Sequence, residues 1–280
     1  MILYFSFCFA TSPETTQGLF LRMLWSRGLI PYFQIPDLAL FGLKFHFFGF
    51  MVALGFILGA SLAAKRAREK GLSARAINDV AILCLIFGIL GAHVVAVLGE
   101  NPSQLWSEPW RSLEVRSGLS SYGGLIGAGI AVAIYFRRKD LPFLPYADAI
   151  MFGLLPGWTL GRIGCFGVHD HPGRLSTSFL AVRFPGGARH DLGLYEAILT
   201  LLISGVLYWL GRRQQPRGFF FTILLFMYPI PRFFLDYLRA FDLADSNPRY
   251  GGLTFPQYGS IALVLWGVYL LRQIRGTRRA

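Results

Sequence analysis

Residues 47–64 read FFGFMVALGFILGASLAA, and the basic run KRAREK follows directly at 65–70. An α-helix needs roughly 17–25 mainly apolar residues to cross the hydrocarbon core of a bilayer. Lys and Arg collect on the cytoplasmic side of membrane proteins, so the basic run indicates the side on which this segment ends. The stretch therefore predicts a membrane-spanning helix over about 45–64 that ends in the cytoplasm.

The composition of the whole chain agrees with a membrane protein. Of 280 residues, 54% are hydrophobic and 15% are charged, with a mean hydropathy of +0.49. Soluble domains average about 45–50% apolar and roughly 25% charged residues. The chain is therefore too apolar for a soluble domain or a disordered one. Its three cysteines are widely spaced, which excludes a disulfide scaffold and a cysteine-based zinc site.

Apolar runs predict an all-α integral membrane protein with seven transmembrane helices. The segments are about 45–64, 77–98, 119–136, 144–162, 193–211, 218–235 and 255–272. Fifteen Lys and Arg residues fall in alternate loops and the C-terminal tail, with only two acidic residues beside them. The remaining loops hold ten basic and ten acidic residues. This alternation predicts an N-terminus outside and a C-terminus in the cytoplasm.

The same alternation explains the net charge of +12. A basic excess confined to one side of the membrane is topological, so no nucleic-acid partner is expected. The first residues, MILYFSFCFA, are apolar but lack the basic region of a signal peptide. We expect residues 1–30 to be an N-terminal extension, with Met23 as a candidate natural start, and residues 31–280 to form the membrane domain.

Polar residues gather at one depth of the predicted bundle. Ionisable groups inside a membrane are costly and are functional candidates by default. Six spans bring such groups to their outer ends: His93, Tyr122 with Gly123 and Gly124, Arg162, Tyr195 with Glu196, Arg232, and Gln257. This convergence predicts a site in the outer leaflet, because a lone arginine would more often be a snorkelling anchor but two at one depth favour a site.

The chemistry of the predicted site is cationic. Arg232, Asp236 and Arg239 are spaced i, i+4 and i+7, so Asp236 can hold both guanidinium groups if the helix continues. Guanidinium groups bind phosphate oxygens bidentately, and lipid headgroups supply phosphate at this depth. Asp148 lies about 21 Å from Arg162 along the same helix and cannot neutralise it. No metal is expected, because His169 and His171 lack a third ligand at zinc spacing.

Six motifs carry a family resemblance. The most specific is GRIGCF at 161–166, followed by Gly173 and Arg174. The other five are FFGFMVALGF at 47–56, YGGLIG at 122–127, RHDLGLYEA at 189–197, PRFFLDYLRAFD at 231–242 and LTFPQ at 253–257. With these motifs in order, the chain over residues 31–272 resembles the bacterial prolipoprotein diacylglyceryl transferases.

The resemblance implies an activity and a location. Members of this family transfer the diacylglyceryl group of phosphatidylglycerol to the lipobox cysteine thiol in the signal peptide of a preprolipoprotein, and glycerol phosphate is released. The implied location is the bacterial inner membrane, among membrane lipids, with the active site toward the periplasm. No metal or organic cofactor is implied.

The resemblance also implies roles for individual residues. Arg162 would bind the phospholipid headgroup and Arg232 would stabilise the departing phosphate. The implied catalytic residues are Arg162, Arg232, Tyr122, Asp170, Asp236 and Arg239. The implied substrate-binding residues are Arg162, Gly123, Gly124, Cys165, His169, Gly173, Arg174, Tyr195, Glu196 and Gln257.

Several positions depart from the family pattern. Tyr122 stands where the family has a histidine, and Cys165 stands where it has an asparagine. A tyrosine with its usual pKa near 10 is a poor general base at neutral pH. If the family histidine accepts the thiol proton, this chain must use His169 or Asp170 or rely on the arginines alone.

These departures leave alternatives to transferase activity. The chain could be a degenerate paralogue that binds phospholipid or lipoprotein without turnover, and Tyr122 and Cys165 motivate this reading. It could also transfer a related lipid-linked group to another acceptor. A transporter is the non-enzymatic alternative, but transporter sites usually lie near the midplane of the bilayer rather than at its outer end.

Overall fold

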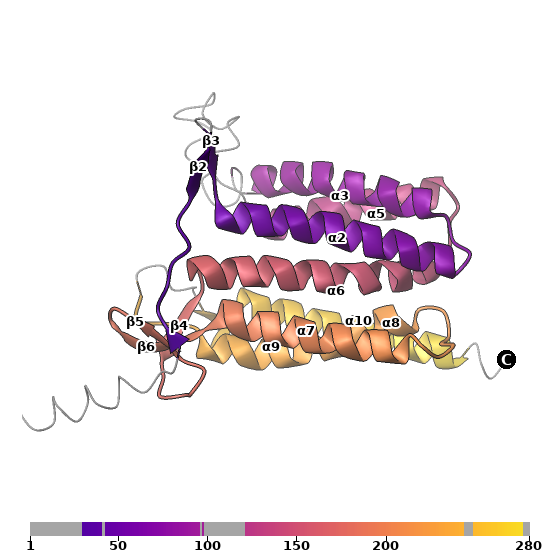
Figure 1. Cartoon of the computed structure of the whole chain (residues 1–280). Coiled ribbons are helices and arrows are strands. Elements are labelled where there is room, and N and C mark those ends of the chain that lie inside the picture. Colours follow the sequence, from indigo (N-terminus) through magenta and orange to yellow (C-terminus); the bar gives the residue numbers. More distant parts are fainter. Residues whose placement is uncertain (1–29, 41–42, 96, 98–120, 244–248, 277–280) are drawn as a thin grey trace, which may run out of the picture.

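The computed structural model describes residues 30–40, 43–95, 97, 121–243 and 249–276, which form a bundle of roughly parallel helices with a small sheet at one end (Figure 1). Helices overlap each of the predicted spans. The helices are α2 (Phe47–Glu69), α3 (Ala74–Val95), α5 (Ser121–Arg138), α6 (Phe143–Val168), α7 (Leu192–Leu210), α8 (Phe219–Met227), α9 (Pro229–Leu235) and α10 (Phe255–Gly276).

Five of the described helical segments are long and apolar enough to cross a membrane. They are α2, α3, α6, α7 and the segment Phe219–Leu238, which joins α8, α9 and the 3-10 helix η4 (Asp236–Leu238). By their length and composition, these helices indicate a multi-pass membrane protein. The predicted extension lies almost wholly outside the described residues, as does most of the segment between α3 and α5.

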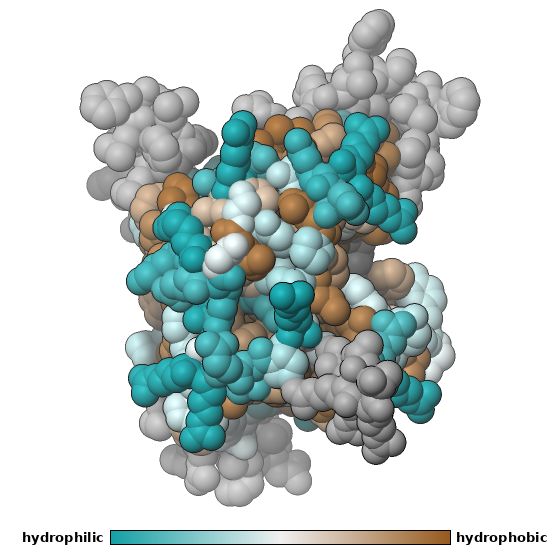
Figure 2. All heavy atoms as spheres, turned by 90° about the vertical axis from the view of Figure 1, so that its right-hand side faces the viewer, coloured by the Kyte–Doolittle hydropathy of each residue, from teal (hydrophilic) through white to brown (hydrophobic). Residues whose placement is uncertain are grey.

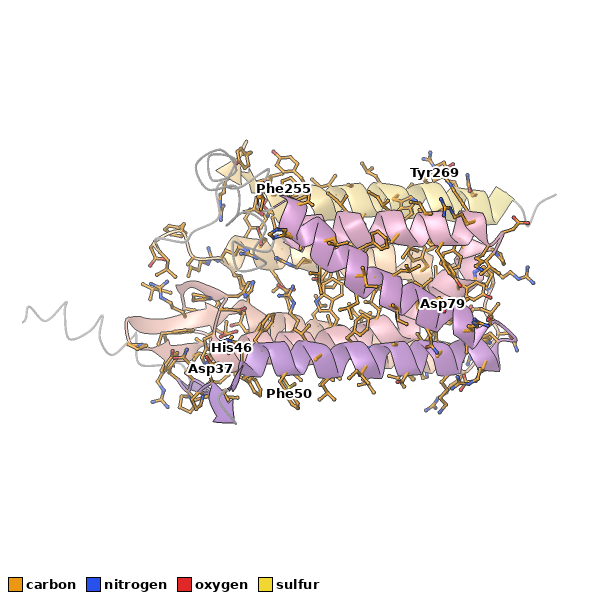
Figure 3. The ribbon with its side chains drawn as sticks, turned by 90° about the horizontal axis from the view of Figure 1, so that it is seen from above. Asp37, His46, Phe50, Asp79, Phe255 and Tyr269 are labelled. Atoms are coloured by element: carbon orange, nitrogen blue, oxygen red, sulfur yellow. The ribbon has the colours of Figure 1, made fainter. Side chains whose placement is uncertain are left out.

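The basic turns lie together at the end of the bundle opposite the sheet. The turns between α2 and α3, α5 and α6, and α7 and α8 share this end with the last turn of α10 (Figure 1). Figure 2 views this end and shows hydrophilic side chains gathered over it. In Figure 3, Asp79 and Tyr269 lie toward it, whereas Asp37, His46 and Phe255 lie toward the sheet end. The charge alternation of the sequence thus corresponds to one basic end of the fold.

Helix α6 is the centre of the bundle. One apolar cluster packs α6 against α2, α3 and α5, and includes Ala67, Ile77 and Tyr146. A second cluster packs it against α7, α8 and α10, and includes Leu155 and Leu207. Each cluster alone would leave one face of α6 uncovered, so the two halves of the bundle are joined through this helix.

Small residues set the distance between α2 and α6. Gly55 and Gly59 of α2 face Gly157 and Gly153 of α6, and a Cβ added to Gly153 would overlap the carbonyl oxygen of Gly59. Glycines spaced by four residues let two helix backbones approach closely in a membrane, where van der Waals contact drives association.

Helices α3 and α5 meet through glycines in the same way. A Cβ on Gly123 would overlap the carbonyl oxygen of Gly91, and one on Gly127 would overlap that of Phe87. A Cβ on Gly124 would lie 3.5 Å from the carbonyl oxygen of Gly88, an ordinary contact distance. Gly123 therefore serves the packing of helices, a use that its place in the YGGLIG motif did not indicate.

The structure corrects three expectations from the sequence. Helix α6 continues to Val168, so Arg162 lies within the helix rather than at its end. The predicted span 218–235 is divided at Tyr228, because Pro229 and Pro231 offer no N–H to continue the helical ladder. The loop predicted at 163–192 contains strands, so the chain is mainly helical rather than all-α.

The strands form a small sheet that closes the end of the bundle. Its order is β1 (Ile30–Pro31), β5 (Val182–Phe184), β6 (Gly187–Asp191) and β4 (Pro172–Leu175). Only β1 pairs in parallel, with Ile30 opposite Val182. Two further pairs are antiparallel: β2 (Leu38–Leu40) with β3 (Leu43–Phe45), and β7 (Arg249–Tyr250) with β8 (Leu253–Thr254). The sheet fixes the segment between α6 and α7, from which several site residues come.

The close contact of α2 with α6 gives the first prediction. We expect Gly153→Ala to lower the free energy of unfolding by about 1–3 kcal/mol, because the added methyl group meets the backbone of Gly59. Thermal unfolding of the protein in detergent measures the effect. Gly205→Ala in α7 is the matched control, since nothing lies within 4 Å of its Cβ position. An equal loss of stability in both variants would contradict close packing as the cause.

Candidate active site

A buried carboxylate joins two arginines from different helices. Glu196, near the start of α7, is fully buried; its Oε2 lies 2.9 Å from an Nη of Arg162 in α6, and its Oε1 lies 3.2 Å from Nε of Arg232 in α9. Tyr228 donates its hydroxyl to the same Oε2 at 3.0 Å. The two arginines that the sequence placed at one depth therefore share one anion, and three helices meet at it.

Asp236 extends this network to a third arginine. Its Oδ1 accepts from Arg232 at 2.9 Å and from Arg239 at 2.5 Å. Its Oδ2 accepts from the hydroxyl of Thr254, whose backbone N–H donates to Gln257. Asp236 thus contacts both guanidinium groups, as their spacing indicates, although η4 replaces the continuous α-helix.

The network carries an excess of positive charge. Three guanidinium groups share two carboxylates, which leaves one positive charge uncompensated within the cluster. Nε of Arg162 is also buried without a hydrogen-bond partner among the described residues. A buried N–H donor without an acceptor costs about 1–3 kcal/mol. The cluster is therefore arranged to receive an anion that offers oxygen acceptors.

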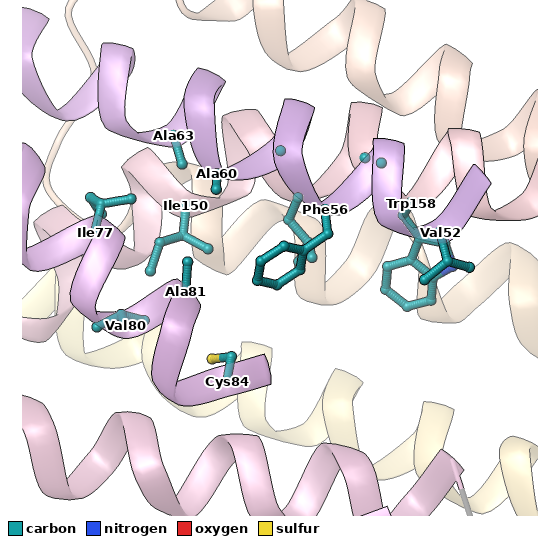
Figure 4. Close-up of a pocket in the computed structure, with 14 residues that line it drawn as sticks. Val52, Phe56, Ala60, Ala63, Ile77, Val80, Ala81, Cys84, Ile150 and Trp158 are labelled. Carbon is teal, nitrogen blue, oxygen red and sulfur yellow. The ribbon is translucent and has the colours of Figure 1, made fainter. Parts of the chain in front are cut away.

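An apolar cavity of about 300 Å³ lies between α2, α3 and α6, and Trp158 is one of its lining residues. Figure 4 shows Val52 and Trp158 toward one end of it and Ile77 toward the other. The ring of Trp158 also lies tilted against that of Tyr228, with centroids 4.8 Å apart, and its centroid lies 6.0 Å from the guanidinium carbon of Arg162. Trp158 therefore connects the polar cluster to a hydrocarbon-lined space.

Cys165, Asp170 and His171 gather beside Arg162. Their ligand atoms all lie within 4.8 Å of one another, so within the described part of the chain this group could hold a metal ion. His169, the other histidine considered from the sequence, is not in this group; Cys165 and Asp170 are its other members. However, an Nη of Arg162 lies 3.9 Å from the cysteine sulfur, and this positive charge opposes a bound cation.

His169 ends α6 in the left-handed conformation, with φ of 52°. Its Nδ1 lies 2.6 Å from Asp191, and both side chains are almost completely buried. Aromatic rings surround the imidazole, including those of Tyr32, Phe33 and Phe184. Asp191 also accepts the backbone N–H of Leu194 and caps α7. His169 therefore joins the sheet to the helices and is enclosed by these rings and Asp191.

A second set of contacts, through Arg189 and Gly173, joins the sheet to the segment that carries Arg239. Arg189 of β6 makes a bidentate pair with Asp242, at 3.0 and 2.6 Å, and donates to the carbonyl of Gly173. The hydrogen bonds from Arg189 hold the pKa of the Asp242 carboxyl below its usual value. Gly173 forms a β-bridge with Arg239, and a Cβ there would lie 2.8 Å from the Cβ of His190. The sheet thereby positions the third arginine.

The remaining predicted residues lie in different places. Tyr195 hydrogen-bonds His190 rather than an arginine, at 2.7 Å. Arg174 is exposed on β4 and makes no hydrogen bond or ion pair with a described residue. Gln257 is buried and joins α10 to the carbonyl of Phe233. The side chain of Tyr122 lies outside the described residues.

The sequence alone did not select four participants: Tyr228, Trp158, Arg189 and Asp242. Arg189 begins the RHDLGLYEA motif and Asp242 ends the PRFFLDYLRAFD motif, so their positions at motif ends were the available signal. Tyr228 and Trp158 lie outside the motifs, in apolar runs where an aromatic residue is expected for packing. Only the folded structure shows that Tyr228 contacts Glu196 and that Trp158 lies against Tyr228.

The chain matches one known family over most of its length. The family described as prolipoprotein diacylglyceryl transferase matches residues 36–272. The chain is 30% identical over 238 residues to the phosphatidylglycerol–prolipoprotein diacylglyceryl transferase of Chromohalobacter salexigens, covering 83% of this chain and 89% of the relative. It is 26% identical over 248 residues to the phosphatidylglycerol–prolipoprotein diacylglyceryl transferase 2 of Clostridium perfringens, covering 85% of this chain and 95% of the relative.

The bridging role of Glu196 gives the second prediction. We expect Glu196→Gln to lower the free energy of unfolding by about 3–5 kcal/mol, because two buried guanidinium groups lose their shared counter-charge. Thermal unfolding in detergent measures the change. The control is Glu69→Gln, which breaks an exposed pair with Arg66 and should cost only about 0–1 kcal/mol. Equal effects of the two substitutions would show that Glu196 is not a buried bridge.

His190 gives a pH-dependent prediction. Burial, and then the nearby charge of Arg174, lower the pKa of His190 below its ordinary value. On acidification the unfolded chain therefore takes up the proton first, so stability falls as the pH drops through about 6.5. We expect the thermal midpoint to fall between about pH 7.5 and 5.5, and to fall less in His190→Gln. The same fall in His190→Gln as in the wild-type protein would contradict this role of His190.

Proposed function

Because this chain belongs to the prolipoprotein diacylglyceryl transferase family, we propose that it transfers the diacylglyceryl group of phosphatidylglycerol to a cysteine thiol of a prolipoprotein. In this reaction the thiolate sulfur forms a bond to the glyceryl carbon, and the bond from that carbon to the phosphate oxygen breaks. Glycerol phosphate leaves with the bonding electrons. The thiol proton must pass to a base before or during the attack.

The observation that carries the proposal is the unpartnered donor of Arg162 within a cluster of net positive charge. A phosphodiester headgroup supplies one negative charge and oxygen acceptors, which complement this cluster. Arginine binds phosphate more specifically than lysine does, because its planar donors match two oxygens at once. We infer that Arg162 binds the headgroup of phosphatidylglycerol.

Arg232 is suited to the departing phosphate. Glu196 and Asp236 hold its guanidinium group from two sides, at 3.2 and 2.9 Å, so it needs little reorganisation when charge develops. The phosphate gains negative charge as the carbon–oxygen bond breaks, and a fixed cation stabilises that state more than the starting diester. Arg239, held by Asp236, supports the same position.

The apolar cavity is suited to an acyl chain. It is lined by small and aliphatic side chains of α2, α3 and α6, and Trp158 links it to the site of Arg162 (Figure 4). We infer that one acyl chain of the lipid lies here while its headgroup contacts the arginines. The hydrocarbon of a lipid then stays in an apolar environment throughout the reaction.

The thiol proton has one accessible acceptor among the candidates from the sequence. His169 is enclosed by aromatic rings and bound to Asp191. Asp170 and His171 are partly exposed, and Oδ1 of Asp170 lies 2.5 Å from Nδ1 of His171. Both residues lie close to Cys165, which neighbours Arg162. We propose that the Asp170–His171 pair receives the proton of the incoming thiol.

The membrane arrangement follows the family and the charge pattern. We propose seven spans in a bacterial inner membrane, with the N-terminus outside, the C-terminus in the cytoplasm and the arginines toward the periplasm. The shared basic end of the turns supports this orientation. The protein substrate is then the signal peptide of a preprolipoprotein with a lipobox cysteine, presented from the surrounding lipids. Residues 31–280 form the membrane domain in this proposal, and residues 1–30 precede it.

A protein that binds lipid without turnover is not favoured. The arginines and carboxylates of the site are all present and in contact, and relatives along nearly the whole chain are named as transferases. The substitutions at Tyr122 and Cys165 leave this network complete.

The fourth prediction tests the reaction directly. The purified protein, phosphatidylglycerol and a lipobox peptide should yield a peptide whose mass increases by one diacylglyceryl group. Arg162→Gln and Arg232→Gln should each lower the rate by about 10²–10³-fold, the range lost with a fixed electrostatic donor. Asp170→Asn should lower the rate by about 10²-fold, as expected for loss of a general base. Mass spectrometry of the peptide measures the rate of product formation by the wild-type protein and by the three variants.

Arg137→Gln, at the basic end, is the control and should keep the wild-type rate. Thermal midpoints identify variants that fail through loss of folding. Binding of phosphatidylglycerol without a product would support the non-catalytic alternative, and full activity of Arg162→Gln would reject the assigned role of that residue.

A further inference from the structure

A second pocket lies at the basic end, opposite the arginine cluster. Its volume is about 310 Å³, and it is formed by the last turn of α2, the start of α6 and the turn between α7 and α8. Leu72, Phe152 and Phe220 contribute apolar walls, and Arg66, Lys70 and Arg217 contribute positive charge. No step of the proposed reaction uses this pocket.

Two charged residues of the pocket already have partners in the fold. Arg66 donates to Glu69 at 3.2 Å and to the carbonyl of Gly211 at 3.1 Å, and its guanidinium carbon lies 4.1 Å from the ring centroid of Phe152. Asp148 accepts the backbone N–H groups of Gly218 and Phe221, at 2.6 and 2.9 Å, and so caps the start of α8. These contacts balance Arg66 and occupy Asp148.

The other two cations have no direct partner among the described residues. The side chains of Lys70 and Arg217 make no hydrogen bond or ion pair with any residue that the structure describes. The amides of Gln214 and Gln215 line the same pocket and offer further donors. Lys70 follows α2, whereas Arg217 lies between α7 and α8. The two cations are far apart in the sequence and meet at this pocket only because the chain folds.

We propose that this pocket binds a phosphate-bearing anion, and that the headgroup of an anionic phospholipid is the form it takes. Ammonium, guanidinium and amide donors complement phosphate oxygens. Basic pockets between helices at the cytoplasmic face of membrane proteins hold such headgroups. The apolar walls favour an anion that carries hydrocarbon over a free inorganic ion. The lipid would link α2, α6 and the turn before α8.

The fifth prediction concerns this site. Native mass spectrometry of the full chain in detergent can follow the binding of dioctanoyl phosphatidic acid, an anionic lipid without the glycerol headgroup of phosphatidylglycerol. Lys70→Gln with Arg217→Gln should weaken one binding step by roughly 30-fold, as expected when two interfacial cations are lost. Gln214→Glu with Gln215→Glu, which adds negative charge and keeps both cations, should also weaken that step.

The matched control removes the same charge from the same end outside the pocket. Arg137→Gln with Arg138→Gln should leave the binding step unchanged. Equal weakening in this control and in Lys70→Gln with Arg217→Gln would show that the lipid is attracted to the basic surface in general, and would overturn the proposal. The absence of weakening in Lys70→Gln with Arg217→Gln would also overturn it. Millimolar glycerol phosphate added as a competitor separates the sources, because displacement assigns the site to soluble phosphate esters and no displacement assigns it to the lipid.

Discussion

The arrangement of the helix ends beside the sheet depends on one buried carboxylate between two arginines. Glu196 is inaccessible to solvent, and removal of a charge from water is costly unless it is closely paired. Its two oxygens lie against Arg162 of α6 and Arg232 of α9. A displacement of any of these helices would separate a buried charge from its partner. The electrostatics of the site therefore constrain the packing of the bundle.

The packing in turn makes this electrostatic contact possible. Glycines at 55, 59, 153 and 157 bring α6 against α2 at backbone distance, and α6 then carries Arg162 into the interior. Pro229 and Pro231 interrupt the helix that would otherwise run straight through Arg232, and Tyr228 at the break reaches Glu196. Close helix contact and a broken helix are both needed for the three charged groups to meet.

The two ends of the molecule differ in chemistry. At one end a small sheet fixes Arg239 through Gly173, and Asp236 pairs with Arg239, so the position of this arginine is set. At the other end Lys70 and Arg217 are unpaired among the described residues and face an open pocket. A reaction requires fixed charges at one site, whereas lipid attachment at an interface tolerates flexible ones.

The sequence by itself determined the features that depend on local patterns. Long apolar runs predicted where helices lie, basic residues in alternate loops predicted a common basic end, and the spacing of Arg232, Asp236 and Arg239 predicted their contact. The ordered motifs predicted the family, which the comparison along residues 36–272 confirmed. Each of these features can be predicted from residues close in the sequence, or from the alternating direction of successive helices.

Only the tertiary structure decided which residues from different helices touch. The sequence placed Glu196 and Arg232 at one depth but could not show that they share oxygen atoms with Arg162, because depth leaves rotation and distance open. It gave no strand between α6 and α7, since the short strands there are stabilised by one another and by β1 rather than by a local pattern. Gly123 likewise belonged to a motif, while its close contact with Gly91 depends on how α3 meets α5.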